Sequence, residues 1–247
     1  MTEATPRAKP RTDTERHIRE QARKLLVSQG AEAVTLRAIA RELGITAPAL
    51  YRYYDSREDL VHQICNDICD DLAAELTVNL AGQPAGDVAG QVFAICRLFR
   101  QWALTHPREF SLVFATPAGQ QPNADPTYTS IGPAALDPFG RIFLGIAGPV
   151  MTRHPVAPPS VDVPAALTED LTRYRSTLVG WLAAAGTEIT PGAPGLPAMY
   201  AMFRFWVRLY GYVALEVFGR FPFGMSDPDA AFEAILLNMF GESGIPT

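Results

Sequence analysis

The side chains best suited to chemistry in this sequence gather between residues 35 and 57. Threonines, arginines and tyrosines occur there among small residues, most densely in the stretch GITAPALYRY at 44–53. Hydroxyl and guanidinium groups donate hydrogen bonds to phosphate oxygens, and a guanidinium can also bridge two acceptors on a guanine base. Small residues at the start of a helix let that end enter the major groove of DNA. Together these residues indicate a surface that contacts double-stranded DNA.

A second group of reactive side chains lies on one predicted helix. His62, Cys65 and Cys69 are spaced at i, i+3 and i+7, so one face could bind a metal or sense an oxidant. The two cysteines also flank an apolar stripe through Ile64 and Ile68, where they would serve as small core residues. Because no fourth ligand is evident, we expect the core role and no metal site.

The sequence lacks the motifs that would indicate an enzyme or a cofactor site. No G-x-S-x-G, Walker loop, H-E-x-x-H or G-x-G-x-x-G is present, so neither catalysis nor a bound cofactor is expected. Three cysteines do not suggest a disulfide framework. The opening residues contain no apolar signal-peptide segment, so we expect a cytoplasmic protein.

Two short helices joined by a glycine turn would position the DNA-contacting residues. Thr35 can cap the first of these helices, and Gly44 can supply a left-handed turn after it. Thr46 can cap the second, since Pro48 is tolerated in a first turn. Leu50 would then pack the second helix against the first. This arrangement is a helix-turn-helix.

Apolar residues at helical spacing recur along the rest of the chain. Thr12 and Glu15 fit a capping box for a first helix at 13–29, and Ser56 can cap a long fourth helix from Arg57. Further helices are expected at about 87–105, 108–115, 136–151, 164–185, 196–219 and 228–241. Since no alternating strand run occurs, the predicted fold class is all-α.

Charge is distributed unevenly along the chain. Residues 1–57 carry 11 Lys or Arg and 7 Asp or Glu, whereas the other residues carry 10 and 19. A basic N-terminal segment on an acidic body is typical of a protein whose N-terminus meets a polyanion. Residues 1–11 are polar and basic, and we expect them to form a flexible arm.

The stretch TLRAIARELGITAPALYRYYDSREDL closely resembles the DNA-binding signature of the TetR family of bacterial transcriptional regulators. The resemblance covers about residues 13–62, and it differs from the common family pattern in having Tyr53 for His and Arg57 for Lys. It implies a three-helix DNA-binding domain at 12–57 and a ligand-binding and dimerisation domain at 58–247. The implied partners are a palindromic DNA operator, a second copy of the chain and a small-molecule effector that relieves repression.

The resemblance also assigns roles to individual residues. It implies that Thr35 and Arg37 lie near a phosphate and a base edge, at the start of the second helix. The residues implied at the floor of the major groove are Thr46, Ala47, Pro48 and Ala49. The residues implied on backbone phosphates are Tyr51, Tyr53 and Arg57.

The C-terminal part loosely resembles a family subgroup with a Trp-His-Gly signature in its ligand domain. FRQWALTHPREFSLVF and FWVRLYGYVALEVFG carry that likeness, although Tyr210 stands where the histidine would precede Gly211. We expect an apolar pocket lined by six aromatic residues, although aromatics at helical spacing are more often core. The six are Phe99, Trp102, Phe114, Phe203, Trp206 and Tyr210.

Residues 199–221 are apolar enough to suggest a membrane span, but Arg204, Arg208 and Glu216 lie inside the segment. Each such charge costs about 2.5–3.5 kcal/mol to insert, so a buried helix or a subunit interface is expected instead. We place the dimer contact on the helices at 164–185 and 196–219. The alternatives are a constitutive DNA-binding protein without effector, or a helical small-molecule-binding protein or enzyme.

Overall fold

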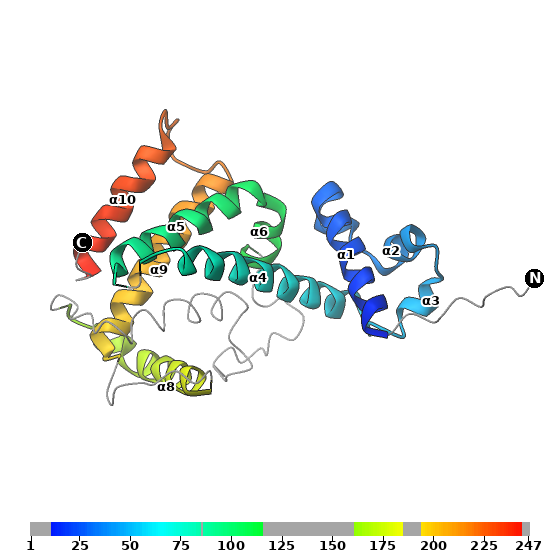
Figure 1. Cartoon of the computed structure of the whole chain (residues 1–247), viewed down its shortest axis with the longest axis horizontal. Coiled ribbons are helices and arrows are strands. Elements are labelled where there is room, and N and C mark those ends of the chain that lie inside the picture. Colours follow the sequence, from blue (N-terminus) through cyan, green and yellow to red (C-terminus); the bar gives the residue numbers. More distant parts are fainter. Residues whose placement is uncertain (1–10, 85, 116–160, 185–193, 244–247) are drawn as a thin grey trace, which may run out of the picture. The chain divides into compact units, whose positions relative to one another are not determined.

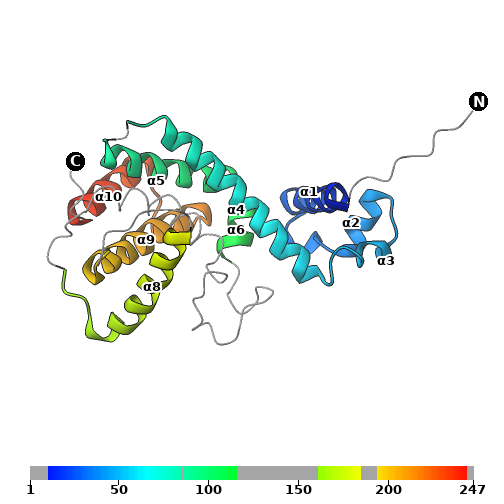
Figure 2. The same cartoon turned by 60° about the horizontal axis from the view of Figure 1, so that its bottom comes forward.

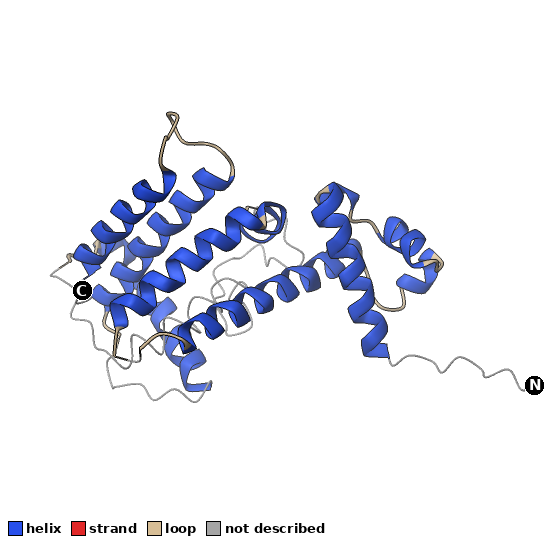
Figure 3. Cartoon of the chain, turned by 45° about the horizontal axis from the view of Figure 1, so that its top comes forward, coloured by secondary structure: helices blue, strands red, loops and turns tan. Residues whose placement is uncertain are grey.

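The structure, a computed structural model, describes residues 11–84, 86–115, 161–184 and 194–243. Every regular element within these ranges is a helix, as Figure 3 shows, so the all-α prediction is confirmed. The helix expected at 136–151 lies outside the described residues. None of the described helices is long and apolar enough to cross a membrane.

The chain forms two compact units, and their boundary falls inside one long helix. The first unit contains the residues up to Ile68 and the segment that begins at Arg108. The second contains the segment from Cys69 to Pro107 and the C-terminal helices. The domain boundary expected after residue 57 stays a prediction.

The first unit is built around three N-terminal helices (Figure 1): α1 (Arg11–Gln29), α2 (Leu36–Leu43) and α3 (Ala47–Leu50). A short 3₁₀ turn, η1 (Ala31–Ala33), connects α1 to α2. The predicted capping box at Thr12 is wrong, because α1 already includes Arg11 and Thr12 lies inside the helix. Glu15 instead pairs with Arg11 one turn earlier, at 2.9 Å.

The helix α4 (Arg57–Ala81) follows, and its start agrees with the prediction. The Ser56 hydroxyl accepts a hydrogen bond from the Asp59 amide at 3.0 Å, as expected of an N-cap. The Asp59 carboxylate in turn accepts from the Asp55 amide at 3.3 Å. The first bond satisfies an amide that the start of α4 would otherwise leave unpaired, and the second pairs the amide of the residue before the cap.

The core of the first unit is formed by fully buried aliphatic residues of all four helices, namely Ile18, Leu26, Ile39, Leu50, Leu60 and Ile64. Burial of one such side chain contributes about 1.5–3 kcal/mol to folding. The helix α6 (Pro107–Phe114) belongs largely to this unit and contributes Phe110, which is 0% exposed.

The second unit contains α5 (Val88–Thr105), α8 (Thr168–Ala184), α9 (Leu196–Val217) and α10 (Pro228–Ser243). Helix α9 contacts each of the other three, as can be followed in Figures 1 and 2. Helices α8 and α9 share a buried cluster of Leu171, Leu178, Leu182 and Met199.

An arginine whose side chain is 13% exposed links three helices of the second unit. Arg100 of α5 forms a bidentate pair with Glu216 of α9, at 2.6 and 2.5 Å, and lies 2.7 Å from Asp229 of α10. The hydrogen bonds that Arg100 donates to the Glu216 carboxylate are the main reason why the pKa of Arg100 is raised above its ordinary value. The charges expected inside α9 are therefore partly satisfied by neighbouring helices.

Candidate nucleic-acid interface

Helices α2 and α3 form a helix-turn-helix whose turn depends on one glycine. Gly44 has φ 65° and ψ 26°, a left-handed conformation that is unfavourable for residues with a Cβ. The turn closes when the Ile45 amide donates to the Ala40 carbonyl at 3.0 Å. Ala40 is 3% exposed and Leu50 is 0% exposed, so both face the core, as the sequence predicts for Leu50.

The opposite side of the motif is open to solvent. Thr35, Arg37 and Arg41 of the α2 segment are exposed, and so are Thr46 and Pro48 at the start of α3. The two alanines on either side of Pro48, Ala47 and Ala49, are half-buried. Because these side chains are small, the N-terminal end of α3 presents little bulk to an approaching surface.

The two cap threonines differ in their hydrogen bonds. The Thr35 hydroxyl accepts a bond from the Ala38 amide at 3.1 Å, as predicted for an N-cap. Thr46 occupies the N-cap position of α3 but makes no side-chain capping bond among the described residues. Its exposed hydroxyl can therefore donate to a group outside the protein.

Three tyrosines follow α3 and have different environments. Tyr51 is 56% exposed, and Tyr53 is half-buried with the Arg11 guanidinium 5.9 Å from its ring centroid. Tyr54 is 3% exposed and donates its hydroxyl hydrogen to the Glu15 carbonyl at 3.2 Å. Tyr51 and Tyr53 are thus accessible to a phosphate, whereas Tyr54 supports the fold.

Arg19 connects Tyr54 to α4. Its Nη1 lies 3.3 Å from the Tyr54 hydroxyl, and its Nε donates to Asp67 at 2.5 Å. Burial raises the pKa of Tyr54, and the nearby Arg19 only partly offsets this effect. Burial lowers the pKa of Arg19, but the bonds to Asp67 and Tyr54 outweigh it and leave that pKa raised.

Arg57 has partners that the sequence did not indicate. Its Nε donates to the Val34 carbonyl at 2.7 Å, and its Nη2 donates to the Ala31 carbonyl at 2.9 Å. The side chain is 37% exposed. A phosphate contact by Arg57 stays a prediction, and the structure gives its guanidinium a second role inside the protein.

Two family models match this chain. Residues 18–64, which include the helix-turn-helix, match the bacterial regulatory proteins of the tetR family, and residues 92–239 match the tetracyclin repressor-like C-terminal domain. An HTH-type transcriptional regulator of Mycobacterium tuberculosis is 30% identical over 228 residues, with 91% of this chain and 89% of the relative covered. The chain belongs to the TetR family. It is a DNA-binding transcriptional regulator, and its family and this relative are regulators, not enzymes.

Solved structures agree with the TetR-family fold. The regulatory protein SCO4313 is 26% identical with a TM-score of 0.62, and the match covers 96% of this chain and 100% of that one. A protein from Rhodococcus sp. RHA1 has a TM-score of 0.57 at 16% identity, covering 95% and 98% of the two chains. The latter shows similarity of fold alone.

The aromatic residues expected to line a pocket of this TetR-family regulator have different exposures. Phe99 is 3% exposed and lies 6.0 Å from Trp206 between ring centroids, and Trp102 is 2% exposed. Trp206 and Tyr210 are half-buried neighbours with centroids 5.3 Å apart, whereas Phe203 is 48% exposed. Phe114 belongs to the first unit and packs on Phe110. Their role as a ligand pocket stays a prediction.

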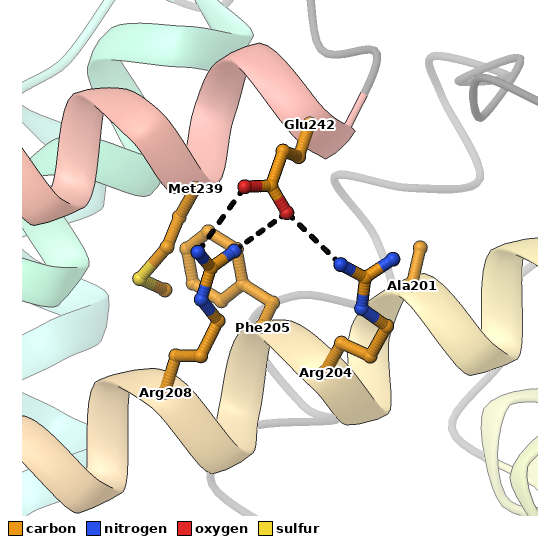
Figure 4. A pocket seen from close by; sticks show the side chains of 6 residues that line it. All are labelled: Ala201, Arg204, Phe205, Arg208, Met239 and Glu242. Carbon is orange, nitrogen blue, oxygen red and sulfur yellow. Dashed lines mark hydrogen bonds and ion pairs between the residues drawn. The ribbon is translucent and has the colours of Figure 1, made fainter. Parts of the chain in front are cut away.

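The two arginines of α9 pair with a carboxylate of α10. Figure 4 shows Arg204 and Arg208 pointing toward Glu242 of α10, with Nη–Oε distances of 3.0 and 2.7 Å. Phe205 and Met239 line the same small hollow.

The cysteines of α4 are poorly placed for thiolate chemistry. Cys69 is 2% exposed, and burial raises the pKa of the Cys65 thiol to about 12. The described residues contain no cluster of His, Cys, Asp and Glu that could hold a metal ion. This environment favours the core role expected for the two cysteines.

Proposed function

We propose that this TetR-family regulator is a dimeric repressor that a small, mostly apolar ligand releases from a palindromic operator. The DNA-contacting role is supported by the helix-turn-helix, which has one buried side and one exposed side. Leu50 and Ala40 are buried, while Arg37, Thr46 and Pro48 are exposed on the other side. A helical hairpin that only filled a core would not require the polar side chains of Arg37 and Thr46 to be exposed beside small residues.

In this proposal, α3 enters the major groove by its N-terminal end. Thr46, Ala47, Pro48 and Ala49 then lie against base edges, and Arg37 reads a base from the start of α2. Tyr51 and Tyr53 donate to backbone phosphates, which set register without reading sequence. The exposed Arg41 and Arg52 add positive charge.

The dimer contact is proposed on α8 and α9. Phe203 and Val207 lie one helical turn apart on α9 and are 48% and 50% exposed, so they form an apolar face that a second copy could cover. A two-fold dimer presents two equivalent DNA-contacting surfaces, which explains a palindromic operator. Val207→Glu should yield monomers in sedimentation, whereas Val78→Glu, at a position 75% exposed on α4, should not.

Selection from a pool of random duplexes tests the DNA-contacting role. The proposal predicts enrichment of an inverted repeat bound by two protomers. The variant Thr46→Glu, which places a negative charge at the start of α3, should enrich nothing. The matched control Thr77→Glu changes an exposed threonine of α4, outside the helix-turn-helix and the proposed dimer contact, and should select the wild-type sequence. Enrichment of an asymmetric site bound by one protomer would contradict the proposal.

The effector is proposed to act by population shift between states that do and do not bind DNA. Once a ligand is found by screening apolar compounds against the regulator–operator complex, it must weaken operator binding. The operator must then weaken ligand binding by the same factor. Trp206→Phe should reduce the ligand response, whereas Phe223→Leu, at an exposed loop position, should not. If none of the screened compounds weakens operator binding, the result would favour a constitutive DNA-binding protein.

A further inference from the structure

Arg57, the first residue of α4, connects this helix to the segment that leads into α2. Its two hydrogen bonds reach carbonyls 23 and 26 residues earlier in the chain, at Val34 and Ala31. Ala31 begins the 3₁₀ turn η1, and Val34 follows that turn and is 1% exposed. The guanidinium therefore holds both ends of the connection between α1 and α2.

This connection determines where α2 begins. Val34 directly precedes Thr35, whose hydroxyl caps α2 through the Ala38 amide. Arg37 is the second residue of α2, so its position depends on the same start. Gly30, with φ 93°, precedes η1 and gives the chain a left-handed turn there. The main chain of this segment also bonds to itself, from the Val34 amide to the Ala31 carbonyl at 3.2 Å, so Arg57 adds side-chain bonds to two carbonyls of an ordered turn.

Arginine is chemically suited to this clamp and lysine is not. A guanidinium presents several N–H donors in a planar fork, so it can hold two carbonyl oxygens in fixed directions. An ammonium is a compact point charge on a flexible stem and cannot reproduce that geometry. Among the described groups, the remaining nitrogen Nη1 has Glu58 at 4.0 Å.

We propose that Arg57 is a positioning residue of the DNA-contacting surface, which fixes the start of α2 and thereby Thr35 and Arg37, and that it is not a phosphate ligand. This inference rests on the proposed DNA-contacting role of α2 and α3. It connects α4 to the base-contacting Arg37 indirectly, through the carbonyls of Ala31 and Val34 and the start of α2.

The test compares operator binding by the full chain and by Arg57→Lys and Arg57→Gln, measured by fluorescence anisotropy over a range of salt concentrations. Both variants should bind about tenfold more weakly, a factor that corresponds to 1.4 kcal/mol. The slope of log K against log salt should stay unchanged, because no phosphate contact is lost. The reference for a lost phosphate contact is Arg52→Gln, which changes an exposed arginine. In this variant the slope of log K against log salt should fall in magnitude by about one.

A double-mutant cycle separates positioning from a general loss of stability. If Arg57 acts through Arg37, Arg57→Gln should cost little affinity in an Arg37→Ala background. The matched control is Arg108→Gln, which removes a similar bond to a carbonyl, that of Val27 at 2.7 Å, and should leave operator affinity unchanged. Amide exchange at Ala38 should accelerate in Arg57→Gln but not in Arg108→Gln.

Three results would overturn the inference. Full affinity in Arg57→Lys with a reduced salt slope in Arg57→Gln would make Arg57 a phosphate ligand. Unchanged affinity in both variants would remove any role in binding. Additive losses with Arg37→Ala would show that Arg57 does not act through Arg37. Failure of the wild-type protein to bind any duplex would instead refute the proposed function itself, and the inference with it.

Discussion

Arg23 of α1 donates a hydrogen bond from its Nε to the Glu109 carboxylate of α6, and the Glu109 side chain is only 4% exposed. The two residues are 86 positions apart in sequence but belong to the same compact unit, and their pair joins α1 to α6. Next to Glu109, the Arg108 guanidinium donates to the Val27 carbonyl at the end of α1. The helix that follows α5 is thus held to the first helix by two guanidinium groups.

Removing Arg23 should destabilise the first unit strongly. Arg23→Gln removes a counter-charge of the buried carboxylate, a loss that typically costs about 3–5 kcal/mol. Glu109→Gln should cost less, because no buried charge remains. Urea unfolding followed by circular dichroism measures both. The exposed pair Arg16–Glu20 provides the control, since Arg16→Gln should cost no more than about 1 kcal/mol. Equal losses in Arg16→Gln and Arg23→Gln would refute this account.

Operator binding should be insensitive to peroxide. Because burial raises the pKa of Cys65 to about 12, its thiol stays protonated at neutral pH and reacts slowly. The double variant Cys65→Ser with Cys69→Ser should keep DNA binding and lose some stability. Anisotropy before and after peroxide treatment is the measurement. If the wild type releases DNA on oxidation and the double variant does not, the cysteines form a redox switch.

The pair of Arg97 on α5 and Glu233 on α10 should make folding stability depend on acid pH. Hydrogen bonding from Arg97 is the main reason why the pKa of Glu233 is lowered, with burial opposing it. A carboxyl whose folded pKa lies below its unfolded value of about 4.3 stabilises the fold above that pH. This contribution is lost as pH falls through the lower, folded pKa.

Comparison of the wild type with Glu233→Gln measures this contribution. Urea unfolding at neutral pH should show a loss of no more than about 1 kcal/mol in the variant, because the pair is solvent-exposed. The difference should vanish at a pH below the folded pKa. An NMR titration of the Glu233 carboxyl carbon should give a midpoint below the unfolded value, and a raised midpoint would contradict the structure.

Local chemistry made most helix starts predictable. Thr35 and Ser56 cap their helices as expected, and Gly44 adopts the left-handed conformation that its position between two helices requires. These features depend on residues within four positions of one another, so the sequence carries the signal directly. The prediction for Thr12 was wrong. Its spacing to Glu15 fits a capping box, but α1 already includes Arg11, one residue before Thr12.

Long-range partners were not predictable in the same way. Nothing local to Arg57 indicates that its guanidinium reaches the carbonyls of Ala31 and Val34. The apolar content of α9 likewise does not distinguish the buried Phe205 from Phe203, which is 48% exposed. A helix that is apolar on several sides has no single inner face that its periodicity could reveal.

The central claim is that the exposed side of α2 and α3 reads the operator, and base-resolved binding tests it most directly. The selected operator is substituted one base pair at a time, and the affinity of each duplex is measured for the wild type, Arg37→Ala and Tyr51→Phe. Arg37→Ala should lose about 1–3 kcal/mol of discrimination at one base pair of each half-site, whereas Tyr51→Phe should weaken all duplexes alike. A profile of base preferences that Arg37→Ala leaves unchanged would contradict the claim.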